Sequence, residues 1–201
     1  MQLEFRVLEL LSSRLCHELI SPVGAINNGV ELIGEEDSDF VKEAMGLIAQ
    51  SAKRAGQRLQ FYRFAYGAGG AGGGAPDAKT LVAGILEGGK ISAEWPDDLS
   101  ALTPEWQKLG CNLALVAAEI LPRGGKIVLA SAGKKKITAM ATGETINLTL
   151  ELKAALGEGA DVAALTGRTI HAYFTSRMAA KLGAKLTLTQ PDPGRAVFTI
   201  A

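Results

Sequence analysis

Residues 15–23 read LCHELISPV, a stretch that carries a helical pattern of apolar residues through a histidine and a proline. The apolar positions are spaced three or four apart: Leu8, Leu11, Leu15, Leu19, Pro22, Ile26, Val30 and Ile33. At about 100° per residue they form one stripe about 100° wide along a helix, with His17 on the opposite face. Because proline has no N–H, the carbonyl of Glu18 loses its helical partner, and the helix is expected to bend or loosen one turn after His17.

A second helical pattern of similar length follows the segment 34–38, so residues 1–66 predict an antiparallel helical hairpin. Within that segment Gly34 suits a helix C-terminus, and Asp37 or Ser38 suits the start of the next helix. Two helices alone leave part of each apolar stripe exposed. We therefore expect a homodimer whose two hairpins form a four-helix bundle.

Residues 67–75 contain six glycines and predict a flexible linker. Residues 76–201 then alternate β-branched runs with helical stretches, the pattern of an α/β sandwich. The expected strands cover 126–130, 136–141, 145–152, 185–189 and 196–200, and the expected helices include 105–118 and 170–182. The predicted fold class is thus a helical hairpin followed by an α/β domain.

The composition narrows the classes of partner. The 201 residues are 47% hydrophobic, and 21 basic residues balance 21 acidic ones, so no global field attracts nucleic acid or anionic lipid. No long apolar run predicts a signal peptide or a membrane span, and we expect a cytoplasmic protein. Cys16 and Cys111 stand alone without metal-ligand spacing, so neither a disulfide nor a metal site is predicted.

The segment from His17 to Pro22, HELISP, resembles the H-box of histidine-kinase phosphoacceptor domains. The continuation SPVGAINNGVEL, residues 21–32, is similar to the ChpT-type histidine phosphotransferases, and the similarity extends along the whole chain. This resemblance implies a second domain related to the kinase ATP-binding fold, of the Bergerat or GHKL type. It also implies that His17 is the phosphoacceptor and that Glu18 holds or tunes its imidazole; the alternative for Glu18 is a solvated helix charge.

The outward face around His17 suits a docking protein, because its residues are mostly small or polar. They are Ser13, Arg14, Ser21, Gly24 and Asn28. Arg14 either screens incoming phosphate charge or is an ordinary exposed arginine. Ser21 either binds a phosphoryl oxygen or its own helix backbone.

The ATP-binding motifs that the kinase resemblance implies are incomplete. Where kinases place two Mg²⁺-binding asparagines four positions apart, this chain has Asn112 and then Val116, which offers no oxygen ligand. The adenine-binding aspartate is missing from 130–140, and the glycines of 157–161 and 166–168 do not form the usual phosphate-binding run. We predict no ATP-binding residues and no ATP hydrolysis.

Without ATP, the phosphoryl donor is expected to be the aspartyl phosphate of a receiver domain. A histidine side chain is largely neutral near pH 7, since its ordinary pKa is about 6.5, so His17 is expected to attack phosphorus as the nucleophile. The chain needs no cofactor of its own, and Mg²⁺ is expected in the receiver. The resemblance implies a receiver domain of a hybrid histidine kinase upstream and response regulators of the CtrA type downstream. The alternatives are an ATP-dependent histidine kinase with a divergent ATP site and a non-catalytic adaptor that binds receivers.

Overall fold

The computed structural model describes residues 5–33, 38–67 and 76–201. The elements in chain order are α1 (Phe5–Leu32), α2 (Ser38–Tyr66), α3 (Ala78–Leu86), β1 (Ile91–Glu94), α4 (Asp97–Ser100), α5 (Pro104–Glu119), β2 (Gly125–Ser131), β3 (Ile137–Thr142), α6 (Leu150–Leu156), the 3₁₀ helix η1 (Val162–Ala164), α7 (Ile170–Lys181), β4 (Leu186–Asp192) and β5 (Arg195–Ile200). The predicted helix boundary at 34–37 and most of the glycine linker lie outside the described residues. Among the described helices, none combines the length and apolar character needed to cross a membrane.

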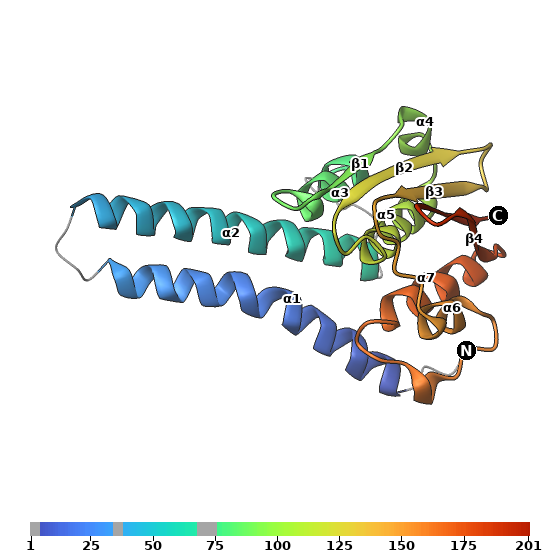
Figure 1. Cartoon of the computed structure of the whole chain (residues 1–201), viewed down its shortest axis with the longest axis horizontal. Coiled ribbons are helices and arrows are strands. Elements are labelled where there is room, and N and C mark those ends of the chain that lie inside the picture. Colours follow the sequence, from blue (N-terminus) through green and yellow to red (C-terminus); the bar gives the residue numbers. More distant parts are fainter. Residues whose placement is uncertain (1–4, 34–37, 68–75) are drawn as a thin grey trace.

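The two long helices form the predicted hairpin (Figure 1). They lie side by side where α1 ends and α2 begins, and they diverge toward the second domain. At Gly29 the helices are so close that an added Cβ would lie 2.6 Å from Cγ1 of Ile48, so only glycine fits there without displacement. The buried residues of α1 are Val7, Pro22 and Gly29, so Pro22 is the one member of the predicted apolar stripe that is buried. Leu8, Val30 and Ile33 of that stripe are exposed in the single chain, because α2 covers only part of it.

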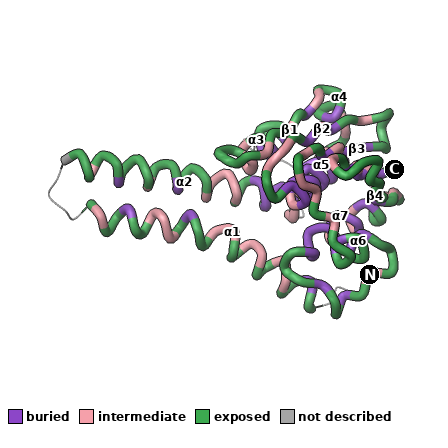
Figure 2. The backbone as a smooth tube through the Cα atoms, in the orientation of Figure 1, coloured by how far each residue is buried: buried purple, intermediate pink, exposed green. Residues whose placement is uncertain are grey.

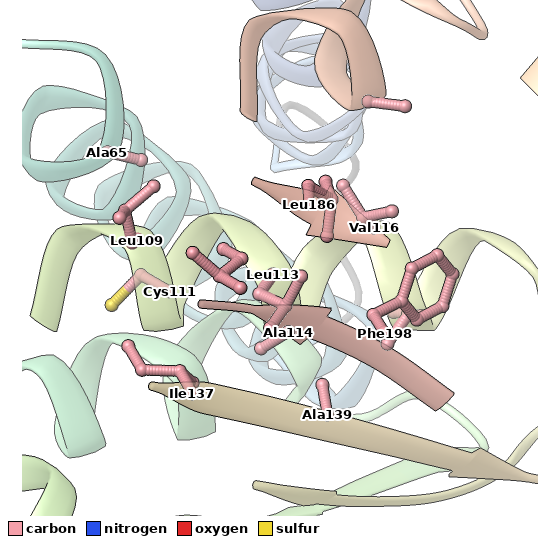
Figure 3. Close-up of a cluster of buried hydrophobic side chains, with 14 of the residues drawn as sticks. Ala65, Leu109, Cys111, Leu113, Ala114, Val116, Ile137, Ala139, Leu186 and Phe198 are labelled. Atoms are coloured by element: carbon pink, nitrogen blue, oxygen red, sulfur yellow. The ribbon is translucent and has the colours of Figure 1, made fainter. Parts of the chain in front are cut away.

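The second domain is a five-stranded sheet with the order β1-β2-β3-β5-β4. β1 pairs with β2 in parallel, and the other pairs are antiparallel. Alternate residues of the central strands are buried, as in the run Ile137, Ala139, Ala141 of β3, and they belong to the same hydrophobic core as the buried residues of α5. Figure 3 shows Leu113 and Val116 of α5 packed among residues of β3, β4 and β5. The predicted helical hairpin and α/β domain are therefore confirmed.

One predicted strand is wrong and one strand was missed. The β-branched run 145–152 is irregular and then enters α6, because the hydroxyl of Thr149 accepts a hydrogen bond from the N–H of Leu152 at 3.1 Å and starts that helix. The missed strand, β1, has four residues and only β2 as a neighbour. So short a strand at the edge of a sheet carries little periodic signal.

The hairpin and the second domain share one hydrophobic core. Val7 of α1 and Phe61, Phe64 and Ala65 of α2 belong to the same cluster of buried side chains as the core of the sheet and its helices. Figure 2 shows this burial at the end of the hairpin nearest the second domain, whereas the distant end is largely exposed. The turn of α1 that carries His17 lies between these two regions.

Candidate functional site

His17 lies in the middle of α1, and its side chain is exposed. Of the residues predicted beside it, Ser13, Ser21 and Asn28 are exposed and Gly24 is half-buried with open space over its Cα. In the part of the chain that the structure describes, the imidazole of His17 makes no hydrogen bond or ion pair. The face around His17 is therefore open to an approaching molecule.

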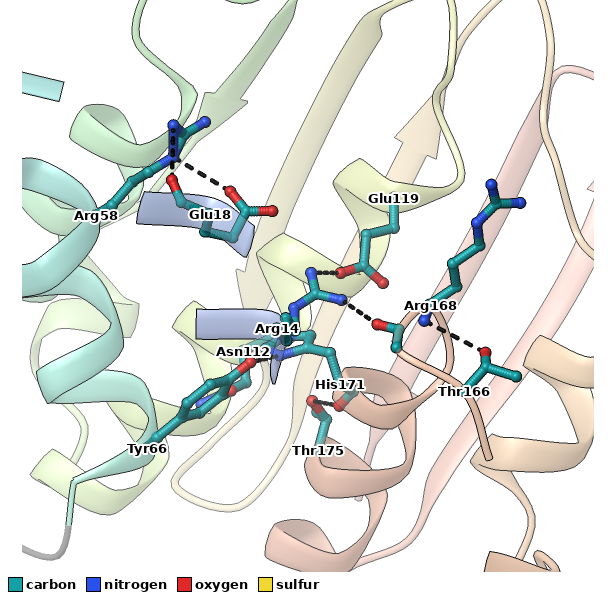
Figure 4. Close-up of polar contacts among 11 residues, drawn as sticks. Arg14, Glu18, Arg58, Tyr66, Asn112, Glu119, Thr166, Arg168, His171 and Thr175 are labelled. Atoms are coloured by element: carbon teal, nitrogen blue, oxygen red, sulfur yellow. Dashed lines mark hydrogen bonds and ion pairs between the residues drawn. The ribbon is translucent and has the colours of Figure 1, made fainter. Parts of the chain in front are cut away.

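Glu18 turns away from this open face toward α2, where Arg58 holds it (Figure 4). Nε of Arg58 lies 3.2 Å from Oε2 of Glu18, an ion pair in which both side chains are about one-third exposed. Nη1 of the same arginine donates to the backbone carbonyl of Glu18 over 3.5 Å. This is the carbonyl that Pro22 leaves without a helical partner.

Arg14, one turn before His17, is bound to the second domain and is not free on the docking face. Its guanidinium pairs with the carboxylate of Glu119 at the end of α5 and donates to the carbonyl of Gly167 over 3.2 Å. Its side chain is only 11% exposed. Two turns earlier, Arg6 donates to the carbonyl of Leu165 over 2.9 Å, so two arginines of α1 hold the loop before α7.

Glu119 is a buried carboxyl group whose charge depends on Arg14. Burial raises its pKa to about 7, and the nearby guanidinium of Arg14 opposes this rise. Removing Arg14 or Glu119 would leave the other group buried without its partner, which is strongly unfavourable. The pair therefore fastens α1 to α5 immediately beside the turn of His17.

His171 is a structural histidine at the junction of α2, α5 and α7. It is fully buried, and burial lowers its pKa to about 3. Nε2 lies 3.1 Å from the backbone carbonyl of Asn112 and must donate to it, so Nδ1 accepts from the hydroxyl of Tyr66 at 2.6 Å. This neutral tautomer ties three helices together, so His171 has a structural role.

Asn112 has a structural contact in this fold. Its side-chain amide is fully buried and donates to the carbonyl of Ala65 at the end of α2 over 3.1 Å and to that of Lys108 over 2.8 Å. Val116, one turn later on α5, is likewise fully buried in the core. The two positions that the kinase resemblance assigns to Mg²⁺ thus pack inside the protein.

A cleft of about 340 Å³ lies between the hairpin and the second domain. It is lined by Ser21 and Pro22 of α1, by Arg54 and Arg58 of α2, and by the segment 84–91 that leads from α3 into β1. Arg54 lies against Gly88, where an added Cβ would be 3.1 Å from its guanidinium. Two arginines and Lys90 therefore line this cleft one turn of α1 beyond His17, and Glu87 lines it as well; we refer to it as the basic cleft.

Sequence reasoning missed Arg58, Glu119 and Tyr66. Arg58 had an indirect signal, because the carbonyl freed by Pro22 needs a donor from elsewhere in the fold. Glu119 and Tyr66 had none, since each meets a partner 105 positions away along the chain.

The comparisons with known proteins agree with this arrangement. The sequence model of the family "Histidine phosphotransferase C-terminal domain" matches residues 75–194. The "Protein phosphotransferase ChpT" of Brucella abortus (strain 2308) is 31% identical over 185 residues, which cover 89% of this chain and 88% of the relative. A solved structure described as a bacterial phosphotransferase aligns with a TM-score of 0.77 and 27% identity over 100% of this chain and 98% of that one.

The family model covers more than half of the chain and lies on the second domain, and the identity to the relative extends over 89% of the chain. We conclude that the chain belongs to the histidine phosphotransferase family and is a protein phosphotransferase of a phosphorelay.

Proposed function

We propose that His17 accepts a phosphoryl group from the aspartyl phosphate of one receiver domain and passes it to the aspartate of another, without ATP. The observation that carries this proposal is the free and exposed imidazole of His17 within an H-box on a long helix. The other histidine, His171, is buried and held on both ring nitrogens. Among the described residues, only His17 therefore offers an accessible imidazole.

The transfer needs little chemistry from this chain. A ring nitrogen of neutral His17 attacks phosphorus in line, the N–P bond forms as the P–O bond to the aspartyl carboxylate breaks, and the electron pair leaves with the carboxylate. The proton on the other ring nitrogen passes to solvent. Mg²⁺ belongs to the receiver in this proposal, so the chain supplies an aimed nucleophile and a docking surface.

We propose that the receiver docks on Ser13, Ser21, Gly24 and Asn28 and reaches the basic cleft beside Ser21. The arginines that line this cleft complement the acidic pocket of a receiver. For Arg14, a direct docking role requires that its guanidinium leave Glu119. Glu18, held by Arg58, acts on His17 from the side of α2 and not from the docking face.

The proposed homodimer would cover apolar side chains that a single chain leaves exposed. On α1 and α2 these include Leu8, Ile20, Val23, Val30, Phe40, Met45, Leu47 and Leu59. Such residues on both helices of a hairpin favour a four-helix bundle between two copies. Analytical ultracentrifugation at micromolar concentration tests this, and a monomer would overturn it; Val30→Glu is expected to shift the mass toward one chain.

We also propose that the second domain, although related to the kinase ATP-binding fold, does not use ATP. The support is the burial of Asn112 and Val116 in the core and the amide contact from Asn112 to α2. Val116 has no oxygen ligand, and the side-chain oxygen of Asn112, although it accepts no hydrogen bond among the described residues, is enclosed in the core away from a hydrated cation. Radiolabelled ATP with Mg²⁺ is therefore expected to leave the protein unlabelled.

The deciding experiment incubates wild type and His17→Gln with a radiolabelled phosphorylated receiver, and in parallel with labelled ATP and Mg²⁺. Acid-labile, base-stable label that passes from the receiver to wild type only supports the proposal. Label from ATP would make the chain a histidine kinase. Receiver binding without any label on His17, across a panel of receivers, would make it an adaptor.

A further inference from the structure

Pro22 leaves one backbone carbonyl of α1 without its helical hydrogen bond, and Arg58 contacts that carbonyl. In an uninterrupted helix, the carbonyl of Glu18 would accept from the N–H of residue 22, which Pro22 lacks. The freed carbonyl belongs to the residue next to His17, so a loosened helix would move the phosphoacceptor itself. A donor from another element is needed to hold this turn in one conformation.

Arg58 of α2 supplies that donor. Its Nη1 donates to the freed carbonyl over 3.5 Å, and its Nε, which makes no hydrogen bond among the described residues, lies 3.2 Å from Oε2 of the same glutamate as an ion pair, so one guanidinium contacts both the backbone and the side chain of Glu18 (Figure 4). The contact is only partly open to solvent, since the two side chains are 31% and 33% exposed. A lysine has a single ammonium and cannot use separate nitrogens to donate to the carbonyl and to pair with the carboxylate.

We propose that Arg58 is a positioning residue for phosphoryl transfer: it replaces the N–H that Pro22 lacks and fixes the turn that aims His17. The proposal rests on His17 being the phosphoacceptor. Arg58 also lines the basic cleft, so a simple docking role is the competing explanation. The two differ in what they alter, because positioning changes the rate of transfer within the complex whereas docking changes the affinity for the receiver.

A double-mutant cycle between positions 22 and 58 tests the proposal. Pro22→Ala returns an N–H to the carbonyl of Glu18, so the variant depends less on Arg58. The probe is the radiolabelled phosphorylated receiver domain that labels wild type fastest. Single-turnover rates are measured over a range of receiver concentrations, which separates the saturating rate from the concentration at half-saturation.

With Pro22 present, Arg58→Ala is expected to lower the saturating rate about tenfold with little change in half-saturation, the size of effect that a charged hydrogen-bond donor supports. Arg58→Lys should lie between wild type and Arg58→Ala. In the Pro22→Ala background, the loss on removing Arg58 is expected to shrink to about threefold, since only the contact with the Glu18 carboxylate remains. Arg63→Ala, at an exposed arginine five positions later on α2, is the matched control and should stay within about twofold.

Equal losses from Arg58→Ala with and without the Pro22→Ala substitution would overturn the proposal, and so would a change in half-saturation alone. Circular dichroism verifies that each variant is folded. If wild type takes no label from the receiver, or His17→Gln takes as much label as wild type, the proposed function is wrong. If wild type is labelled on His17 but the substitutions at positions 22 and 58 show no coupling, the proposed function stands and the positioning role of Arg58 is wrong.

Discussion

The two histidines of this chain occupy opposite environments. His17 lies exposed on α1 without a polar contact in the described structure, whereas His171 is fully buried between Tyr66 and the backbone of Asn112. The same side chain is therefore accessible to solvent in one place, which supports the nucleophilic role proposed for His17, and is a neutral structural link in the other. Burial and hydrogen bonding, and not residue type, separate the two roles.

The largest expected effect is on phosphoryl transfer, which should depend on His17 and not on His171. His17→Gln should abolish acceptance of the phosphoryl group, because no other described imidazole is accessible, and should leave the urea midpoint of unfolding nearly unchanged. His171→Gln should retain most of the transfer rate. Equal activity of His17→Gln and wild type in the receiver-labelling assay would contradict this assignment.

The next effect concerns the ion pair between Arg14 and Glu119, which fastens α1 to α5. Glu119→Ala leaves the guanidinium of Arg14 buried without its carboxylate, and the free energy of unfolding is expected to fall by about 3 kcal/mol. Glu144→Ala, which removes an exposed pair with Arg123 at 3.6 Å, should change it by less than about 0.5 kcal/mol. Urea titration measures both, and similar losses would show that the Arg14 pair contributes no more than a surface pair.

A smaller effect compares the same substitution at both histidines. His171→Ala deprives the hydroxyl of Tyr66 of its acceptor in a buried site and is expected to lower the free energy of unfolding by about 2 kcal/mol. His17→Ala removes an exposed side chain and should stay within about 0.5 kcal/mol. A loss at His17 as large as that at His171 would mean that the exposed histidine also supports the fold.

The smallest effect is a pH dependence in which Glu119 and His171 oppose each other. The pKa of Glu119 rises from 4.5 to about 7 on folding, so between these values the folded state holds a proton and stability increases as pH falls. The pKa of His171 falls from 6.5 to about 3, so the unfolded state gains a proton first and stability is lost as pH falls below 6.5.

Between about pH 6.5 and pH 5 these two contributions largely cancel in the wild type. Glu119→Gln should therefore lose stability on acidification in this window relative to wild type, by up to about 1.4 kcal/mol per pH unit. His171→Leu should instead gain stability over the same window. Urea midpoints at pH 6.5 and pH 5 measure this, and parallel pH profiles for the three proteins would exclude the assigned protonation states.

Prediction from sequence succeeded where the signal was local and repeated. The apolar pattern over seven turns of α1 and the β-branched runs of β2, β3, β4 and β5 identified the hairpin and most of the sheet. It failed for β1, which is too short for periodicity, and for 145–152, where the cap at Thr149 starts a helix instead of a strand. The exposed position of His17 followed from its angle on the helix.

The sequence by itself determined the hairpin, the α/β class, the family resemblance and the choice of His17 as the proposed phosphoacceptor, because each depends on neighbours within a few turns of chain. The tertiary structure alone decided that Arg14 is held by Glu119, that Asn112 and His171 are structural, and that Arg58 holds the carbonyl freed by Pro22. These contacts join residues from 40 to 105 positions apart. The physical reason is that a buried polar group takes whichever partner the packed chain brings within reach, and no local pattern records that partner.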